Sequence, residues 1–528
     1  MTVLYLIVCA AALVSVLLSM KRDLMMLQQN SNRNDRYVKW LEKAGESTAV
    51  SRLCFMALGL MCMLKFMPHV VCMSCVGIAS VWASALLATE KYKKPLVFTK
   101  RATRIYTVAI LLVALCVASC LLIFGGDVEH LTYVAAAVLA LSYAFSYWYV
   151  LASNWLLKPV EKRINQKYYD EAAAILASNP DLTVIGVTGS YGKTSTKHYL
   201  YRILSEQYDV LMTPGNFNTT LGVIRTIREH MKPYNQIFIA EMGAKQPNDI
   251  KEICDLVHPR IGIITAVGPQ HLESFKTIER VQSTKFELAD SLPSDGLVVV
   301  NDDFEFIANR PVSNVKCVRY AVDNTHAADF HATDIEYTPQ GTHFSIANAE
   351  GVQIRLFTRL VGKCNVSNLM AAVIVALHMG VDKDKIRYAV EKIEQVEHRL
   401  SIKRLPSGIT IIDDAYNSNP VGSSMALEVL GSMKDGKRII ITPGMIELGT
   451  DQYRLNKEFG SKIAESADVA FVVGEYNKNA ISEGINAADR KIDVRFAPSF
   501  IEAHREMLTI AKPGDTVLFE NDLPDTFK

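Results

Sequence analysis

Residues 184–195 read VIGVTGSYGKTS, and this stretch decides the fold of most of the chain. The β-branched run that starts at Val184 predicts a buried parallel strand, and the glycine-rich turn after it predicts a helix that begins near Lys193. Such a helix N-terminus presents unpaired backbone N–H groups to an anion. Lys193 would reach the β- and γ-phosphates of a nucleotide, and the Thr194 hydroxyl would bind Mg²⁺. We therefore predict a nucleotide site; a plain glycine turn is the alternative, because Val187 replaces the first glycine of the common phosphate-binding loop.

The overall composition excludes some classes of function. At 528 residues the chain has room for about three or four domains. The formal net charge of +1 argues against nucleic acid or another polyelectrolyte as a partner. Ten cysteines occur without the paired spacing of a metal site, which indicates small buried hydrophobic residues in a reducing compartment.

Residues 1–155 are strongly apolar and predict a transmembrane anchor of about five helices. The predicted spans lack the polar face of a soluble helix, and most are long enough to cross a hydrocarbon core. Lys65 is the only ionisable candidate in them and lies at the end of a span, so we predict an anchor or lipid-facing platform and no transport path. Buried core helices are the alternative. The predicted spans are Met1–Met20, Leu53–Phe66, His69–Ala88, Tyr106–Gly126 and Leu131–Trp155.

The charges of the connecting loops give the orientation. Residues 21–52 hold seven Lys or Arg against four acids, and residues 90–104 hold six against one. The short segment Asp127–Glu129 is acidic instead. The positive-inside rule places both basic loops, and everything after Trp155, in the cytoplasm. We therefore predict a multi-pass protein of the cytoplasmic membrane, with the lipid bilayer as a partner and the N-terminus outside.

Residues 156–180 predict a juxtamembrane helix, because apolar residues recur at helical spacing between charged ones. Lys158, Lys162 and Arg163 in this helix would touch anionic lipid, unless they only form a solvated face. The helix leads into the strand at Val184.

Two further predicted strands lead into residues with metal-binding side chains. Ile237–Ala240 is followed by Glu241, and Ile261–Ala266 is followed after a short loop by His271. In an open α/β sheet, ligands gather at the carboxyl ends of the strands, where the phosphate loop also lies. A carboxylate and an imidazole suit Mg²⁺ or Mn²⁺ beside phosphates. Either residue alone would more often be a plain loop or surface residue, but beside the phosphate loop they predict a metal site.

Residues 396–528 independently predict a Rossmann-like, doubly wound α/β domain. Short β-branched runs alternate there with helical stretches such as Pro420–Met433. The predicted strands are Ile409–Ile412, Arg438–Thr442, Val469–Val473 and Thr516–Phe519. Two α/β domains at one nucleotide site suggest closure, with Gln395–Arg399 near the hinge.

A series of motifs runs from the phosphate loop towards the C-terminus. The series is TGSYGKTS (188–195), TPGNFNTTLGV (213–223), AEMGA (240–244), HLE (271–273), STKFE (283–287), NDD (301–303), GKCNVSN (362–368), Arg399, IDDAYNSNP (412–420) and GMIELG (444–449). In this order the motifs resemble those of the Mur ligases, the ATP-dependent amide-forming enzymes of cell-wall peptide synthesis. The resemblance implies a P-loop central ATP-binding domain over residues 181–395 and the family's C-terminal domain over residues 396–528.

The resemblance also implies ATP, two Mg²⁺ ions and roles for individual residues. The implied ATP-binding residues are Gly189, Ser190, Gly192, Lys193, Thr194, Ser195, Asn301 at the adenine end, Arg399 and Asp414. The implied catalytic residues are Lys193, Glu241, His271 and Lys285, of which the last three would join Thr194 as metal ligands. Substrate contacts are implied for Asn216, Asn218, Thr219, Tyr416, Asn417 and Asn419.

Lys285 matches the lysine that many family members carry as a carbamate. A carbamate converts a cation into an oxygen-donor anion, which a hard metal prefers. A plain ion pair between Lys285 and Glu287 on one helix is the alternative.

The implied reaction activates a carboxylate. The γ-phosphoryl group of ATP passes to the carboxylate of a cell-envelope precursor, and the amine of an amino acid or dipeptide attacks the acyl phosphate. Amide, ADP and phosphate result. Three alternatives stay open: a ligase that builds a poly-amino-acid such as poly-γ-glutamate, a P-loop ATPase that energises a membrane process, and a silent nucleotide-sensing scaffold.

The chain departs from the family pattern at three places. Membrane spans and one helix stand where the family has a domain that grips a UDP-linked sugar. Cys364 replaces a histidine, and Phe519–Asp525 replaces the usual basic Lys-Gly-Ser ending. These departures make a soluble UDP-linked acceptor less secure than the ligase chemistry, and they favour the hypothesis of a lipid-linked acceptor at the inner leaflet.

Overall fold

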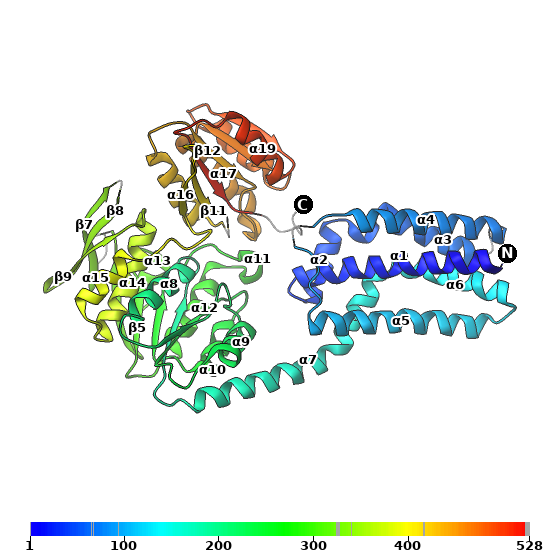
Figure 1. Cartoon of the computed structure of the whole chain (residues 1–528), viewed down its shortest axis with the longest axis horizontal. Helices are drawn as coiled ribbons and strands as arrows, with labels where there is room; N and C mark the ends of the chain where they lie inside the picture. The colour runs from blue at the N-terminus through cyan, green and yellow to red at the C-terminus, as the bar shows by residue number, and fades with distance from the viewer. Residues whose placement is uncertain are drawn as a thin grey trace. The chain divides into compact units, whose positions relative to one another are not determined.

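The computed structural model describes residues 2–64, 66, 68–92, 94–323, 328–338, 340–415 and 418–522. The chain divides into two compact units, a helical one up to Gln166 and an α/β one from Lys167 to Asp522. The long helix α7, Ser146–Ala177, contains the boundary between them (Figure 1).

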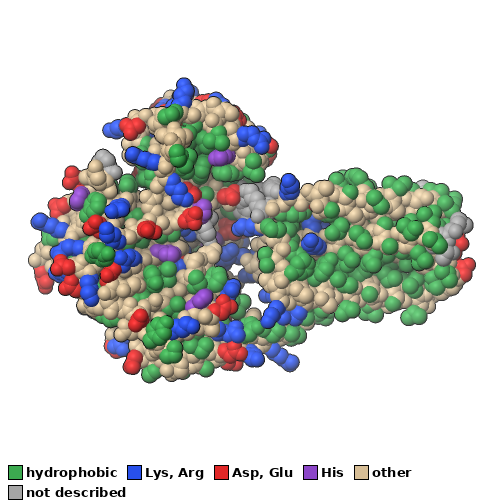
Figure 2. Space-filling model, viewed as in Figure 1, with side chains coloured by type: hydrophobic (Ala, Val, Ile, Leu, Met, Phe, Trp, Pro, Cys, Tyr) green, Lys and Arg blue, Asp and Glu red, His purple; other side chains and the backbone are tan. Residues whose placement is uncertain are grey.

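The helical unit consists of long apolar helices that lie side by side (Figure 1). Before α7 its elements are α1 Thr2–Gln29, α2 Asn34–Lys43, the 3₁₀ turn η1 Glu46–Thr48, α3 Val50–Met63, α4 His69–Thr89, α5 Lys100–Phe124 and α6 Val128–Ala144. α1 packs against α4, α5 and α6, and α3 packs against α6. Hydrophobic side chains cover much of the outer face of this unit (Figure 2). Apolar residues thus fill the inside of the bundle and also its surface, as in a protein surrounded by lipid.

The predicted number of five spans needs correction. Within the described residues, three helices are long and apolar enough to cross a membrane: Val3–Gln29, His69–Thr89 and Lys100–Phe124. α6 and α7 add a fourth only if they form one broken span, because the two helices meet at a 74° bend. α3 has 14 residues and is therefore about 21 Å long, shorter than a hydrocarbon core of about 30 Å.

A buried polar cluster, which the sequence did not predict, lies where α6 meets α7. Asp23 of α1 lies 2.7 Å from a guanidinium nitrogen of Arg52 on α3. Ser146, the first residue of α7, donates to Asp23 and accepts from Arg52 at 2.8 Å. Lys65 is therefore not the only ionisable candidate, because α1 continues past Met20 and includes Asp23; Lys65 itself lies outside the described residues. The paired charges explain how the bundle buries Asp23 and Arg52.

The predicted juxtamembrane helix is the second half of α7 and not a separate element. α7 continues through Pro159, and Glu161 on it pairs with Arg104 of α5 at 2.7 Å. The three basic residues predicted to touch lipid are all exposed: Lys158, Lys162 and Arg163.

The first sheet of the α/β unit has nine strands in the order β2-β3-β1-β4-β5-β6-β7-β8-β9. Adjacent strands are parallel as far as β7, and β8 and β9 extend the sheet in antiparallel fashion. The strands are β1 Thr183–Thr188, β2 Val210–Met212, β3 Ile237–Glu241, β4 Ile261–Ile264, β5 Leu297–Asn301, β6 Lys316–Ala321, β7 Phe330–Thr338, β8 Gly341–Asn348 and β9 Gly351–Thr358. The register pairs Val187 with both Glu241 and Ile263, so the phosphate loop and the ends of β3 and β4 share one edge.

The second sheet has six strands in the order β10-β11-β15-β12-β13-β14, and only β10 is antiparallel. The strands are β10 Ser401–Arg404, β11 Thr410–Asp414, β12 Arg438–Thr442, β13 Val469–Val473, β14 Asp493–Ala497 and β15 Thr516–Glu520. This topology confirms the predicted α/β architecture of the C-terminal part, with the predicted strands at β11, β12, β13 and β15.

Helices cover the sheets of this unit (Figure 1). Those after the first sheet's strands are α8 Lys193–Leu204, α9 Thr220–His230, α10 Asp249–Val257, α11 Leu272–Phe275, α12 Ile278–Asp290, α13 Glu305–Ala308, α14 Lys363–His378 and α15 Lys383–Glu391. Those of the C-terminal part are α16 Pro420–Ser432, the 3₁₀ turn η2 Gly449–Asp451, α17 Gln452–Ser466, α18 Lys478–Ala487 and α19 Phe500–Ile510.

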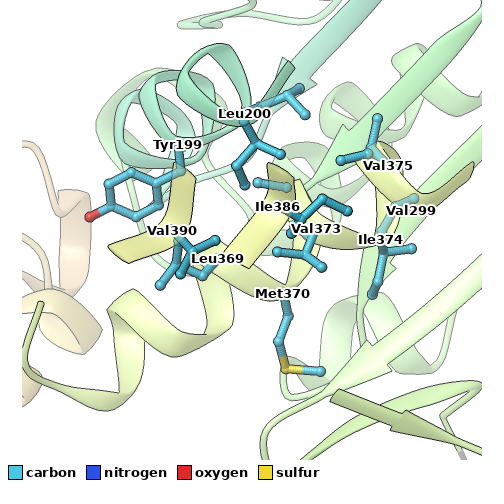
Figure 3. Close-up of a cluster of buried hydrophobic side chains, with 14 of the residues drawn as sticks. Tyr199, Leu200, Val299, Leu369, Met370, Val373, Ile374, Val375, Ile386 and Val390 are labelled. Carbon is cyan, nitrogen blue, oxygen red and sulfur yellow. The ribbon is translucent and has the colours of Figure 1, made fainter. Parts of the chain in front are cut away.

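The helix behind the phosphate loop is anchored in a dense apolar core. Tyr199 and Leu200 of α8 pack with side chains of α14, α15 and β5, such as Val373, Ile386 and Val299 (Figure 3). The Tyr199 hydroxyl leaves this cluster and donates to Asn365 at 2.7 Å. Because the core fixes α8, the position of its first turn, where Lys193 lies, is also fixed.

Candidate active site

The phosphate loop joins β1 to α8 and requires both of its glycines. Gly189 has φ +150°, and a Cβ there would lie 2.1 Å from the Thr265 hydroxyl oxygen. Gly192 has φ +78°, and a Cβ there would lie 2.3 Å from an Asn368 side-chain oxygen. Ser190 ties the loop to the chain after β4, because its backbone N–H donates to Ala266 at 2.7 Å. The loop is thus held in a conformation that only glycine allows at two positions.

Lys193 and Thr194 occupy the first turn of α8 as predicted. The Lys193 amine donates to the backbone oxygen of Gly189 at 2.6 Å, so it lies folded over its own loop. Burial lowers the pKa of Lys193 to about 8, and the charge of Glu241 opposes this shift. The Thr194 hydroxyl donates to Glu241 at 3.2 Å. Ser195 follows these two residues and is buried.

Glu241 at the end of β3 is the most enclosed acid of the site, with a side chain 1% exposed. Asn218 donates to its Oε1 atom at 3.1 Å. The Lys197 amine lies 2.9 Å from its Oε2 atom, but no described residue makes an aligned hydrogen bond to that oxygen. Burial raises the pKa of Glu241, but the charges of Lys197 and Lys193 outweigh it and hold the pKa below the usual value. Glu241 is therefore a carboxylate with one oxygen still able to accept a ligand.

Lys197 is a site residue that the sequence analysis missed. Its side chain is fully buried, and besides Glu241 it contacts the loop before α9, donating to the backbone oxygen of Gly215 at 2.6 Å. The signal was present in the sequence, because Lys197 follows Lys193 by four residues and so shares its face of α8. Lys197 links three parts of the site: the phosphate-loop helix, the carboxylate at the end of β3 and the 213–219 loop.

We expect Lys197→Met to lower the free energy of unfolding by about 3–5 kcal/mol, because it leaves Glu241 charged, buried and without its cation. Denaturation by urea, followed on the full chain in detergent, measures the change. Lys251→Met is the matched control, since its exposed pair with Asp255 should leave the unfolding midpoint unchanged. Adding Glu241→Gln to Lys197→Met should restore part of the loss, and no restoration would contradict the pairing.

His271 lies after β4, and its imidazole ring forms a hydrogen bond with a residue of the C-terminal domain. Its Nδ1 atom bonds to the carboxylate of Glu447, and the Glu447 backbone oxygen accepts from the N–H of Glu273 at 3.2 Å. Both His271 and Glu447 have a left-handed backbone, with φ +53° and +61°. Burial lowers the pKa of His271, although Glu447 opposes this shift. The imidazole is therefore close to the site and paired with an acid of the second domain.

Lys285 on α12 is buried, 1% exposed, and within the described part of the chain its amine has no hydrogen bond or ion pair. Burial, followed by the charge of Lys193, lowers the pKa of Lys285 well below the usual value. The alternative of an ion pair with Glu287 is not what the structure has. The Glu287 carboxylate accepts from the backbone N–H groups of Asn248 at 2.7 Å and Lys251 at 3.0 Å.

The second domain brings Arg399 and Asp414 to the same region. The charge of Arg399 helps to lower the pKa of Lys193 and opposes the rise in the pKa of Asp414. Burial raises the pKa of Asp414 to about 6 against the effect of Arg399. Cys364, at the start of α14, packs against the apolar core of the second domain.

Those of the remaining predicted residues that the structure describes have structural contacts. Asn301 donates to Thr265 and Ser367, at 3.0 Å each, and so does not present its amide outwards. Thr219 and Asn419 cap α9 and α16. Asn216 lies in the loop before α9, and its backbone oxygen accepts from Asn218. Tyr416 and Asn417 lie outside the described residues.

The oxygen donors at the phosphate loop fit Mg²⁺. Among the described residues, no three His, Cys, Asp or Glu side chains form a metal cage. Mg²⁺ does not need one beside a nucleotide, because it uses one or two carboxylates together with phosphate oxygens and water. Glu241, whose Oε2 atom lies 2.9 Å from the Lys197 amine but receives no aligned hydrogen bond from a described residue, and the Thr194 hydroxyl supply such donors.

Comparisons with known proteins agree with this geometry. The Mur ligase middle domain matches residues 187–376, and the domain described as Mur ligase, glutamate ligase domain matches residues 398–520. The UDP-N-acetylmuramoyl-tripeptide–D-alanyl-D-alanine ligase of Mycobacterium tuberculosis is 31% identical over 66% of this chain and 71% of that protein. The chain belongs to the Mur ligase family. The enzyme of the same name from Bacillus subtilis is 29% identical over 64% of this chain and 72% of that protein.

Solved structures of MurF enzymes are similar to this Mur ligase. MurF from Acinetobacter baumannii superposes with a TM-score of 0.61 at 26% identity, over 67% of this chain and 77% of that one. MurF ligase from Thermotoga maritima in complex with ADP gives 0.60 at 26% identity, over 68% and 80%. The predicted resemblance is confirmed, and this Mur ligase is an ATP-dependent acid–amino-acid ligase. The ADP in the Thermotoga maritima structure agrees with the use of ATP by this ligase.

Proposed function

We propose that this Mur ligase is anchored in the cytoplasmic membrane, where it joins the amine of an amino acid or dipeptide to the carboxylate of a lipid-linked cell-envelope precursor. The observation that carries the proposal is a helical unit with three apolar, membrane-length helices ahead of the two ligase domains. The relatives named above act on a UDP-linked tripeptide. An anchored enzyme would instead meet an acceptor held in the same membrane.

The residues of the site support the two-step chemistry. The γ-phosphoryl group of ATP moves to the acceptor carboxylate; the amine then attacks the acyl phosphate and releases phosphate and a proton. Lys193 would turn from the backbone oxygen of Gly189 to the transferring phosphoryl group, because both accept its N–H groups. The backbone N–H groups at the start of α8 would hold the β-phosphate.

Two metal positions complete the proposed site. Thr194 and Glu241 would hold one Mg²⁺, and His271 with a carbamate on Lys285 would hold the second. Bound Mg²⁺ supplies positive charge that neutralises the phosphates during transfer. His271 would exchange its contact with Glu447 for the metal, and the buried amine of Lys285, which has no ion pair among the described residues, would react with CO₂.

Contacts within the helical unit support the proposed orientation. Gln28, near the end of α1, donates to Val97 in the basic α4–α5 connection at 2.9 Å, and Arg101 at the start of α5 donates to Asn154 of α7 at 3.2 Å. The basic loops and the part of α7 that leads to the ligase domains therefore share one end of the bundle. The positive-inside rule assigns this end to the cytoplasm and the N-terminus to the outside.

Turnover of matched acceptors tests the proposal. The full chain in phospholipid vesicles receives ATP, Mg²⁺, D-alanyl-D-alanine and either a UDP-linked or a lipid-linked precursor; ADP release and product mass are measured. We expect amide formation with the lipid-linked acceptor. Turnover of the soluble acceptor alone would overturn the lipid proposal, and ADP release without a new amide would overturn the ligase proposal. Release of the chain from membranes by alkaline carbonate would contradict the anchor.

A further inference from the structure

Lys197 lies against the carboxylate that would hold the first metal, although no step of the reaction described above uses this lysine. Its side chain is fully buried, and its amine lies 2.9 Å from the Oε2 atom of Glu241. The Oε1 atom of the same carboxylate already accepts hydrogen bonds from Thr194 at 3.2 Å and from Asn218 at 3.1 Å. Oε2 is therefore the oxygen that is left for a metal ion, and it is also the oxygen that the Lys197 amine faces.

The contact between Lys197 and Oε2 acts mainly through charge. The two atoms are within the distance of an ion pair, but among the described residues none makes an aligned hydrogen bond to Oε2. The aligned hydrogen bond of the amine goes instead to the backbone oxygen of Gly215, at 2.6 Å. A carboxylate oxygen that is held by charge alone can exchange one cation for another without the loss of a directed bond.

A divalent ion bound to Oε2 would meet the Lys197 amine at close range. Two positive charges within about 4 Å of each other repel strongly where water is excluded, and the Glu241 side chain is 1% exposed. The oxygen therefore serves either the amine or the metal. When the amine gives way, the backbone oxygen of Gly215 still accepts one of its N–H groups, so the lysine keeps a partner in the 213–219 loop.

We propose that Lys197 holds the place of the first Mg²⁺ on Glu241: its amine neutralises the buried carboxylate until the metal takes Oε2, and it then stays bound to the 213–219 loop. Lys197 is thus a positioning residue that sets how much metal the site requires. This role rests on the proposed metal ligands Thr194 and Glu241, and it holds whichever acceptor or amine the ligase uses.

Mn²⁺ binding to the full chain in detergent tests this role. ADP is held below the concentration of the chain, and free Mn²⁺ is measured by electron paramagnetic resonance. We expect Lys197→Gln, which is polar but uncharged, to bind Mn²⁺ at least about tenfold more tightly than the native chain. The reason is that a neighbouring unit charge changes the affinity of a carboxylate for a proton, another cation, by about ten- to a thousandfold. Lys251→Gln, at an exposed lysine, is the control and should bind Mn²⁺ like the native chain.

Thermal unfolding of the same variants gives a second measure. Mn²⁺ together with ADP should raise the unfolding temperature of Lys197→Gln by more than that of the native chain, because the metal supplies the charge that the variant lacks. A lysine that only supported the fold would behave differently. Its removal would leave the affinity for Mn²⁺ unchanged or would weaken it.

Equal or weaker Mn²⁺ binding by Lys197→Gln would overturn the role of Lys197 and leave the ligase function intact. If the native chain binds no Mn²⁺ in the presence of ADP, the proposed metal site fails, and the role of Lys197 fails with it. If Lys197→Gln folds only when Mn²⁺ and ADP are present, this rescue supports the role. A variant that stays unfolded with the metal present overturns it.

Discussion

Lys193→Ala is expected to lower kcat for amide formation by about 10³-fold. The lysine amine lies at the first turn of α8, where the backbone donors of the phosphate loop converge, and it donates to the backbone oxygen of Gly189 in that loop. Its charge is needed most when negative charge spreads over the transferring phosphoryl group, so the loss falls on the rate and less on KM for ATP. Single-turnover formation of ADP from radiolabelled ATP measures the change.

The same variant should be more stable than the native chain when no nucleotide is bound. The folded-state pKa of Lys193 is about 8, below its ordinary value of 10.5, so the unfolded chain binds more protons between these pH values. Native stability is therefore reduced fully below about pH 8 and recovers as pH rises towards 10.5. Lys193→Ala should remove this rise, which thermal unfolding at a series of pH values detects. A destabilised variant would mean that the activity loss comes from misfolding, and a retained rise would mean that a group other than Lys193 causes it.

Short sequence patterns correctly predicted those strands whose burial follows from their own residues. Arg438–Thr442 and Val469–Val473 were predicted with the bounds that the structure has, because buried parallel strands are continuous apolar runs between helices. The antiparallel strands β8 and β9 were not predicted. β8 is buried along most of its length and β9 mainly in its second half, and the position of both strands depends on the pairing of β8 with β7 and of β9 with β8.

The helical unit shows where hydropathy alone fails. Met20 looked like the end of the first span because charges follow it, yet α1 continues to Gln29. Asp23 stays inside the helix because Arg52 neutralises it, and Arg22 pairs with Glu46 through two contacts of 2.7 Å. These partners lie more than twenty residues away in sequence. A hydropathy analysis that considers each span separately therefore cannot detect them.

Some residues of the site could be predicted from the sequence, and others could not. The phosphate loop, Thr194 and Glu241 were predicted because strand ends and glycines mark them in the sequence. Lys197 was missed, since a lysine on a helix is usually exposed and only the packing of α8 shows that this one is buried. The contact between His271 and Glu447 joins residues 176 positions apart, one in each of the two ligase domains. Sequence spacing carries no information about such a contact.

Lys285→Met is expected to lower the ligase rate by about 100-fold or more, and the native rate should depend on CO₂. Burial lowers the pKa of Lys285 well below its usual value and so favours the neutral amine, and only the neutral amine adds to CO₂ to give a carbamate and a proton. The carbamate oxygens would then bind metal, which the methyl thioether of methionine cannot do.

ADP release is measured in CO₂-free buffer and again after bicarbonate is added, with recovery expected for the native chain and not for Lys285→Met. Lys316→Met, at an exposed lysine, is the control and should respond like the native chain. A native rate that ignores CO₂, together with ¹³C spectra that lack a carbamate signal, would contradict the modification. An inactive Lys285→Met variant would then mean that Lys285 acts as an unmodified amine.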